Sequence, residues 1–147
     1  MDAATLHDEA SFGEFVGAFE RAELPRARWT HGAHVAIGTL YTLRHGDHVL
    51  AKTRAAIRRH NASVGTPENA YHETLTVFWL AVVGEFLRRS EHASELEAVR
   101  AAVAEFGEQR KLHGSYYGFD VVASPEARAS WVAPDLRAIE VRFLTSY

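Results

Sequence analysis

The chain has 147 residues, a formal net charge of −3 and a hydrophobic fraction of 47%. This length fits a single domain, and the hydrophobic share is large enough to build a buried core. The sequence contains no cysteine, which excludes disulfides, thiolate catalysis, cysteine-ligated zinc and iron–sulfur clusters. Acidic and basic residues are interspersed without a basic block, so we expect no nucleic-acid partner.

The N-terminal segment and the apolar runs favour a cytoplasmic protein. Residues 1–14 carry acidic side chains where a signal peptide would have a basic region followed by an apolar one. The most apolar run, residues 75–87, has about 13 residues and contains Glu85, whereas a helix that spans a bilayer needs about 20. We therefore expect neither a signal peptide nor a membrane partner.

Hydrophobic residues recur with helical spacing along most of the chain, which predicts an all-α, single-domain bundle of about five helices. The predicted helices cover residues 11–23, 30–45, 47–61, 67–89 and 91–109. Thr30 is the expected N-cap of the second helix, Gly46 follows its end, and Pro67 begins the fourth. The core would cover about residues 9–110. Residues 111–147 should form a loop, a short helix over 124–131 and an irregular tail, in which residues 139–144 could add a short strand.

Two histidine segments carry the clearest chemical signal. His31 and His34 are one turn apart on the second helix, so their imidazoles lie within about 60° of each other around its axis. His72 falls on the inward stripe of the fourth helix, beside Glu73. Short connections make successive helices antiparallel, so the second and fourth helices should begin at the same end of the bundle. The three imidazoles are therefore expected to face the interior at similar depth.

Three neutral imidazoles and one carboxylate suit a divalent transition metal, such as Fe, Zn, Mn, Ni or Cu, with an open coordination position. We predict a metal site formed by His31, His34, His72 and Glu73. Glu73 could be a ligand, orient a histidine or act as the base for a metal-bound water. The alternative is that each histidine is only a hydrogen-bonded structural residue.

Two further residues are predicted to take part in catalysis. Tyr117 could offer its hydroxyl to the pocket, although a buried tyrosine with one hydrogen bond is the simpler alternative. Arg128 could hold an anionic group, or it could pair with Asp135 and pin the tail. His45 shares the face of His31 and His34 but lies about three to four turns further along. The remaining histidines are expected at the surface or its boundary: His7, His48, His60, His92 and His113.

Three blocks of sequence belong together. They are Trp29-Thr30-His31-x-Ala33-His34, Tyr71-His72-Glu73-Thr74-Leu75-Thr76-x-x-Trp79 and Ser124-Pro125-Glu126-Ala127-Arg128-x-x-Trp131-Val132-x-Pro134-Asp135-Leu136. The set resembles a family of small, uncharacterised bacterial proteins, and the similarity spans about residues 29–139. One departure is Gly118, where the resemblance implies a serine after the tyrosine. The resemblance implies that the blocks form one functional unit, but it implies no particular reaction, substrate or metal.

The leading hypothesis is a metal-dependent enzyme that acts on a small molecule, by hydrolysis or lyase chemistry through metal-bound water or by oxygen-dependent chemistry. The second is a metal-free enzyme in which His72 and Glu73 form an acid–base pair and His31 or His34 polarises the substrate. The third is a non-catalytic protein that binds a small ligand or assembles, for example as a homodimer. Under any of these hypotheses, the tail from Phe119 could close over the site or pack against a second chain.

Overall fold

The computed structural model describes residues 1–144, and every regular element within them is helical. The α-helices are α1 (Glu9–Glu20), α2 (His31–His45), α3 (Val49–Ser63), α4 (Glu73–Arg88), α5 (Glu95–Phe106) and the short α6 (Pro125–Ala129). Short 3₁₀-helices join them: η1 (Ala3–Leu6), η2 (Arg26–Arg28), η3 (Gly46–His48), η4 (Glu68–Ala70) and η5 (Leu112–Ser115). The prediction of an all-α bundle with five main helices and an irregular tail is confirmed.

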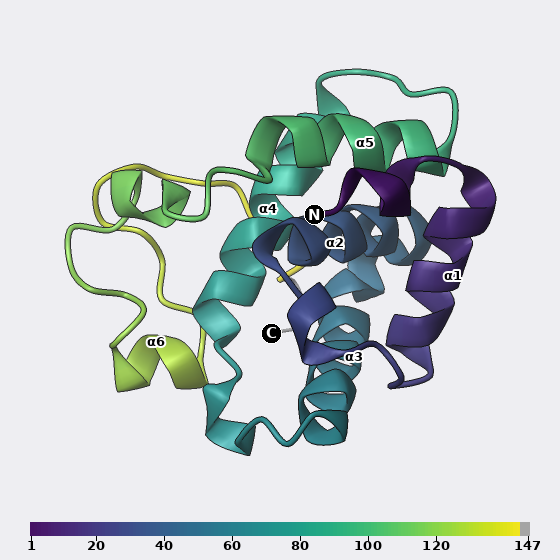
Figure 1. Cartoon of the computed structure of the whole chain (residues 1–147). Coiled ribbons are helices and arrows are strands. Elements are labelled where there is room, and N and C mark those ends of the chain that lie inside the picture. Colours follow the sequence, from purple (N-terminus) through teal and green to yellow (C-terminus); the bar gives the residue numbers. More distant parts are fainter. Residues whose placement is uncertain (145–147) are drawn as a thin grey trace.

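Helix α2 lies in the middle of the bundle and packs against α3, α4 and α5 (Figure 1). Helix α1 packs against α3, and α6 packs against α4. The composition of α2 explains its position, since small and apolar residues cover most of its circumference. Its buried residues are Gly32, Ala33, Val35, Ala36, Ile37, Gly38, Thr39, Leu40 and Tyr41. Within the part of the chain that the structure describes, no helix is both long enough and apolar enough to cross a bilayer.

Both predicted ends of α2 are confirmed. The Thr30 hydroxyl accepts a hydrogen bond from the Ala33 N–H at 3.2 Å, as an N-cap residue does. Gly46 follows the helix with φ of 52°, a backbone conformation that L side chains rarely adopt. His31 and His34 therefore stand in the first turn of a helix whose start is fixed by its own sequence.

The predicted start of α4 is wrong. Pro67 leads into η4, Tyr71 and His72 have extended backbone, and α4 begins only at Glu73. His72 is the N-cap of α4, because its Nδ1 accepts a hydrogen bond from the Leu75 N–H at 3.1 Å. His72 is thus at the entrance of the helix and not in its second turn, as the sequence had predicted.

Two other expectations are corrected near the ends of the chain. Helix α5 begins after Ser94 and not at Glu91, because the Ser94 hydroxyl caps the helix by accepting from the Glu97 N–H. Residues 139–144 form no strand, since no neighbouring strand among the described residues could pair with them. Val141, Phe143 and Leu144 instead pack against the hydrophobic core.

Candidate functional site

A cavity of about 800 Å³ lies between α2, α3, α4 and the segment that follows α5. This volume falls within the range of about 300–1,000 Å³ that is usual for small-molecule sites. Its wall is mainly apolar and aromatic, with Trp29, Val35, Ile37, Ile57, Leu75, Trp79, Leu80 and Val83. The polar and imidazole side chains on the wall are His31, His34, Thr53, Asn61, Thr66, Tyr71, His72, Thr76 and His113.

The mouth of the cavity lies where its lining residues are exposed to solvent. These are His34 in the first turn of α2, Ala70 before α4, Arg110, Lys111 and Gly114 after α5, and Val122 before α6. Among the described residues that line the cavity, none is acidic, whereas Arg110 and Lys111 are cationic. The cavity therefore combines an apolar interior with a positive entrance.

His34 presents an unoccupied ring nitrogen to the cavity. Its Nδ1 lies 2.7 Å from the Thr30 carbonyl, so Nδ1 carries the proton and donates it. No side chain or backbone group in residues 1–144 donates to its Nε2. The ring lies on the Trp29 ring with 3.9 Å between centroids. Desolvation by the protein around the cavity lowers the pKa of His34 to about 4, so the imidazole is neutral at pH 7.

His31 has the complementary arrangement. Its Nε2 donates to the Phe106 carbonyl of α5 at 3.1 Å, so Nδ1 keeps the lone pair. Its ring meets the Trp79 ring edge-on at 4.7 Å. Burial lowers the pKa of His31, and the charge of Arg110 lowers it further. His31 and His34 are therefore two neutral hydrogen-bond acceptors held by backbone carbonyls.

His72 lines the same cavity, but both of its ring nitrogens are already engaged. Nδ1 caps α4, and Nε2 donates to the Val121 carbonyl at 2.8 Å. Burial lowers the pKa of His72, so the imidazole stays in the neutral form that makes both hydrogen bonds. His72 ties the start of α4 to the segment that precedes α6, and in this arrangement it has no free lone pair for a ligand.

Glu73 points away from the histidines. Its carboxylate makes two hydrogen bonds with Arg54 of α3, at 3.0 and 2.5 Å, and accepts a third from the Tyr71 hydroxyl at 2.7 Å. Its side chain is 7% exposed, and it does not line the cavity. His31, His34 and His72 thus line one cavity, and Glu73 does not. Over residues 1–144, no group of three or more His, Cys, Asp or Glu side chains is arranged to hold a metal.

Tyr117 is buried outside the cavity. Its hydroxyl donates to the Val132 carbonyl at 2.7 Å, and burial raises its pKa above the ordinary value. The simpler alternative, a buried tyrosine with one hydrogen bond, describes this arrangement. A close contact with Asp135 explains why position 118 is a glycine. The Gly118 N–H donates to Asp135 Oδ1, and a Cβ at this position would lie 2.8 Å from Asp135 Oδ2.

Arg128 fastens the mouth of the cavity without lining it. Its guanidinium donates to the carbonyls of Asn69, Ala70 and Val122 at 3.0–3.2 Å. Two of these carbonyls belong to the mouth residues Ala70 and Val122. The tail after Phe119 thus closes part of the site through Val122.

His113 is a site residue that the sequence did not reveal. It was expected at the surface or its boundary without a role as a ligand, yet it lines the cavity, and its Nδ1 is buried with no hydrogen-bond partner in the described part of the chain. It lies on η5, in a segment without helical periodicity, so no sequence spacing points to it. His60 was also placed at the surface wrongly, since it is 1% exposed. Its inward position continues the spacing of Val49, Thr53 and Ala56 on α3, which is a signal that could have found it.

The arrangement as a whole offers an enclosed apolar volume, acceptor nitrogens at fixed positions and two cations at the entrance. The described residues of the wall include no carboxylate that could act with His72 as an acid–base pair. No protein-family model, curated protein or solved structure matches this chain.

Proposed function

We propose that this protein binds a small, mainly apolar molecule in the cavity between α2, α3 and α4. The observation that carries the proposal is the pairing of a cavity of about 800 Å³, mainly apolar, with imidazole nitrogens that have no partner among residues 1–144. Sites for small molecules are typically apolar clefts with a few polar groups that fix the orientation of the ligand. Trp29 and Trp79 supply flat apolar surface, and His31 and His34 supply the polar groups.

The unpartnered polar atoms of the cavity indicate which hydrogen-bonding groups the ligand carries. Thr53 Oγ1 and His113 Nδ1 are buried without a hydrogen bond to any of the described residues, and both residues line the cavity. Leaving a buried polar group unpaired costs about 1–3 kcal/mol, so retained unpaired groups favour a bound partner. Neutral His31 and His34 can only accept through their free nitrogens. A ligand with a hydroxyl or amine donor on an apolar body fits these groups.

A substitution that fills the cavity tests this proposal. Thr76 lines the cavity and is half-buried, with its hydroxyl bonded to the His72 carbonyl. Thr76→Phe should weaken binding of the neutral apolar dye N-phenyl-1-naphthylamine at least about tenfold, because the ring occupies the volume the dye would use. Thr42→Phe is the matched control: Thr42 is also half-buried and bonds the Gly38 carbonyl, but it does not line the cavity.

Dye binding would be measured by fluorescence titration of both variants and the native chain, after circular dichroism has verified that each is folded. The native chain and Thr42→Phe should bind with the same affinity. A native chain that does not bind the dye, or equal binding by Thr76→Phe, would contradict the proposal.

Metal-dependent chemistry on a small molecule is the second candidate, and the hydrogen bonds of His31 and His34 favour it. Each donates one N–H to a backbone carbonyl and leaves the other nitrogen free, which is the arrangement found around metal-bound histidines. Such nitrogens suit Fe, Zn, Mn, Ni or Cu. His72 and Glu73 would join as ligands only by giving up their present hydrogen bonds to Val121 and Arg54.

Metal analysis separates this candidate from simple ligand binding. The chain, purified without a histidine tag, would be incubated with each of the five metals, dialysed and measured by mass spectrometry. One metal is expected to remain bound at one ion per chain and to be lost in His34→Ala, whereas His48→Ala, at an exposed position on η3, should keep it. Retention of none of the metals would remove this candidate.

A further inference from the structure

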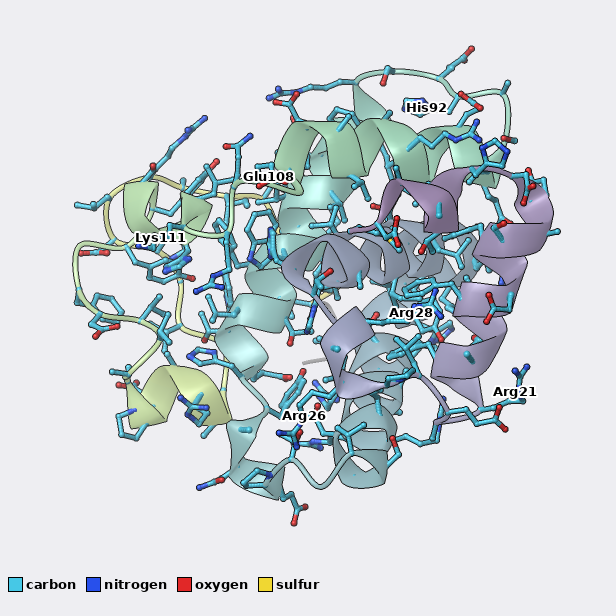
Figure 2. The ribbon with its side chains drawn as sticks, in the orientation of Figure 1. Arg21, Arg26, Arg28, His92, Glu108 and Lys111 are labelled. Carbon is cyan, nitrogen blue, oxygen red and sulfur yellow. The ribbon has the colours of Figure 1, made fainter. Side chains whose placement is uncertain are left out.

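The entrance of the cavity carries two cations without partners. Arg110 and Lys111 line the mouth, both are exposed, and neither side chain forms an ion pair or hydrogen bond with any residue from 1 to 144. Figure 2 shows Lys111 on the connection between α5 and α6, well away from Arg26 near the bottom of the view. Arg26 is engaged with the Val64 carbonyl and does not line the cavity. The free positive charge at the entrance therefore comes from two neighbouring residues.

No negative charge on the cavity wall offsets these cations. The lining contains no Asp or Glu within the described residues, and Glu73 is turned toward Arg54. The imidazoles of His31 and His34 are neutral, since burial lowers the pKa of each. Glu108 does not line this cavity, although its charge acts on His31 and it lines a second, smaller cavity together with Arg110 and Lys111. A ligand that enters therefore meets positive charge first and apolar surface behind it.

We infer that the ligand is an amphipathic carboxylate, with its anionic head at Arg110 and Lys111 and its apolar body between Trp29 and Trp79. This inference rests on the proposed function and names the class of ligand. A guanidinium matches a carboxylate in geometry and can bond it through two parallel N–H groups. The apolar body gains from leaving water, while the head keeps its charge at the exposed entrance and avoids the cost of burial.

The inference is tested with two probes that share a chain length and differ in the head group. Decanoate and 1-decanol would each be used to displace N-phenyl-1-naphthylamine from the native chain. Decanoate should displace the dye at concentrations about tenfold lower than decanol, because only decanoate gains the two charge-assisted contacts. The difference should shrink at about 0.5 M salt, since the entrance is exposed and its charges are screened.

Two double variants assign the preference to the entrance. Arg110→Ala with Lys111→Ala should weaken decanoate about tenfold and change decanol by less than about twofold. Lys52→Ala with Arg59→Ala removes the same charge from exposed positions of α3 that do not line the cavity, and it should leave both probes unchanged.

The outcomes separate the ligand class from the proposed function. If the dye binds but decanoate and decanol displace it equally, the amphipathic carboxylate is wrong while small-molecule binding stands. The amphipathic carboxylate is also wrong if the two double variants behave alike, because net charge and not the entrance would then set the preference. If the native chain binds no dye, both small-molecule binding and the amphipathic carboxylate are wrong.

Discussion

His34 is the residue that most clearly defines the chemistry of the cavity. Its Nδ1–H is bonded to the Thr30 carbonyl, its ring lies on Trp29, and its Nε2 faces no protein donor within residues 1–144. Each contact fixes one property: the tautomer, the orientation of the ring and the availability of a lone pair. The lowered pKa, about 4, keeps the lone pair available throughout the physiological range of pH.

Acidification should therefore destabilise the fold through His34. Its pKa is about 4 in the folded chain and 6.5 in the reference state, so the unfolded chain takes up the proton first as the pH falls. The stabilisation is complete above the unfolded pKa and is lost as the pH falls from there toward the folded pKa. Between about pH 7.5 and about pH 5, the native chain should lose more stability than His34→Gln, by on the order of 1 kcal/mol. This free-energy difference is smaller than the full pKa shift of His34 would give, because the His34 ring keeps solvent-accessible surface.

Urea unfolding at the two pH values would measure this difference. His48→Gln, at an exposed position, should behave like the native chain. Some pH dependence should remain in His34→Gln, because burial also lowers the pKa values of His31 and His72. An unchanged pH dependence in His34→Gln would show that His34 is not protonated in this range on unfolding.

Glu73 has a structural role that any activity measurement must take into account. Its carboxylate joins α4 to α3 through Arg54 and also fixes Tyr71. Removing one partner of a buried ion pair leaves the other partner uncompensated and destabilises the fold. A loss of function in a Glu73 variant would therefore need a stability measurement beside it before it indicated catalysis.

At the scale of elements, local signals predicted the start and end of α2 and the presence of the short helix α6. Thr30, Gly46 and Ser124 act through residues two to four positions away, so the sequence alone contains what is needed. The start of α4 could not be predicted in the same way. Thr66 and Pro67 have the pattern of a helix start, but the chain uses them for η4.

Tertiary contacts decide where α4 begins. The Tyr71 side chain is buried, the Arg58 guanidinium lies over its ring, and its hydroxyl bonds Glu73. These contacts hold residues 71 and 72 in extended conformation and move His72 from the second turn to the N-cap. The predicted group of four ligands depended on His72 and Glu73 standing inside one helix. The actual partners of His72 and Glu73 are Val121 and Arg54, which lie on other segments of the chain. No local sequence pattern indicates that these segments come together.

The entrance of the cavity was beyond sequence prediction for a related reason. Arg110, Lys111 and His113 lie between α5 and α6, where the chain has neither helical periodicity nor a recognisable turn signal. Only the folded arrangement brings this segment beside the first turn of α2. His31, His34 and His72 do line the same cavity, whereas their role as a group of metal ligands stays a prediction.

At the scale of the whole molecule, the described part of the chain leaves a cavity inside the bundle. Helix α2 packs against three neighbours, yet the space between α2, α3 and α4 contains the cavity. An apolar volume left open forgoes packing that would otherwise stabilise the fold. Any molecule that fills the volume and binds only the folded chain must therefore raise its stability.

This linkage predicts the thermal behaviour of the whole chain. At a decanoate concentration about 100 times the dissociation constant, the folded state should gain about 2.7 kcal/mol. For a chain of this size, such a gain corresponds to a rise in melting temperature of about 5–10 °C. Thr76→Phe should show little or no rise, because its added ring occupies the binding volume, whereas Thr42→Phe should respond like the native chain. Differential scanning calorimetry would measure all three. An equal rise in Thr76→Phe would mean that decanoate binds elsewhere, since the two variants differ in whether the new ring enters the cavity.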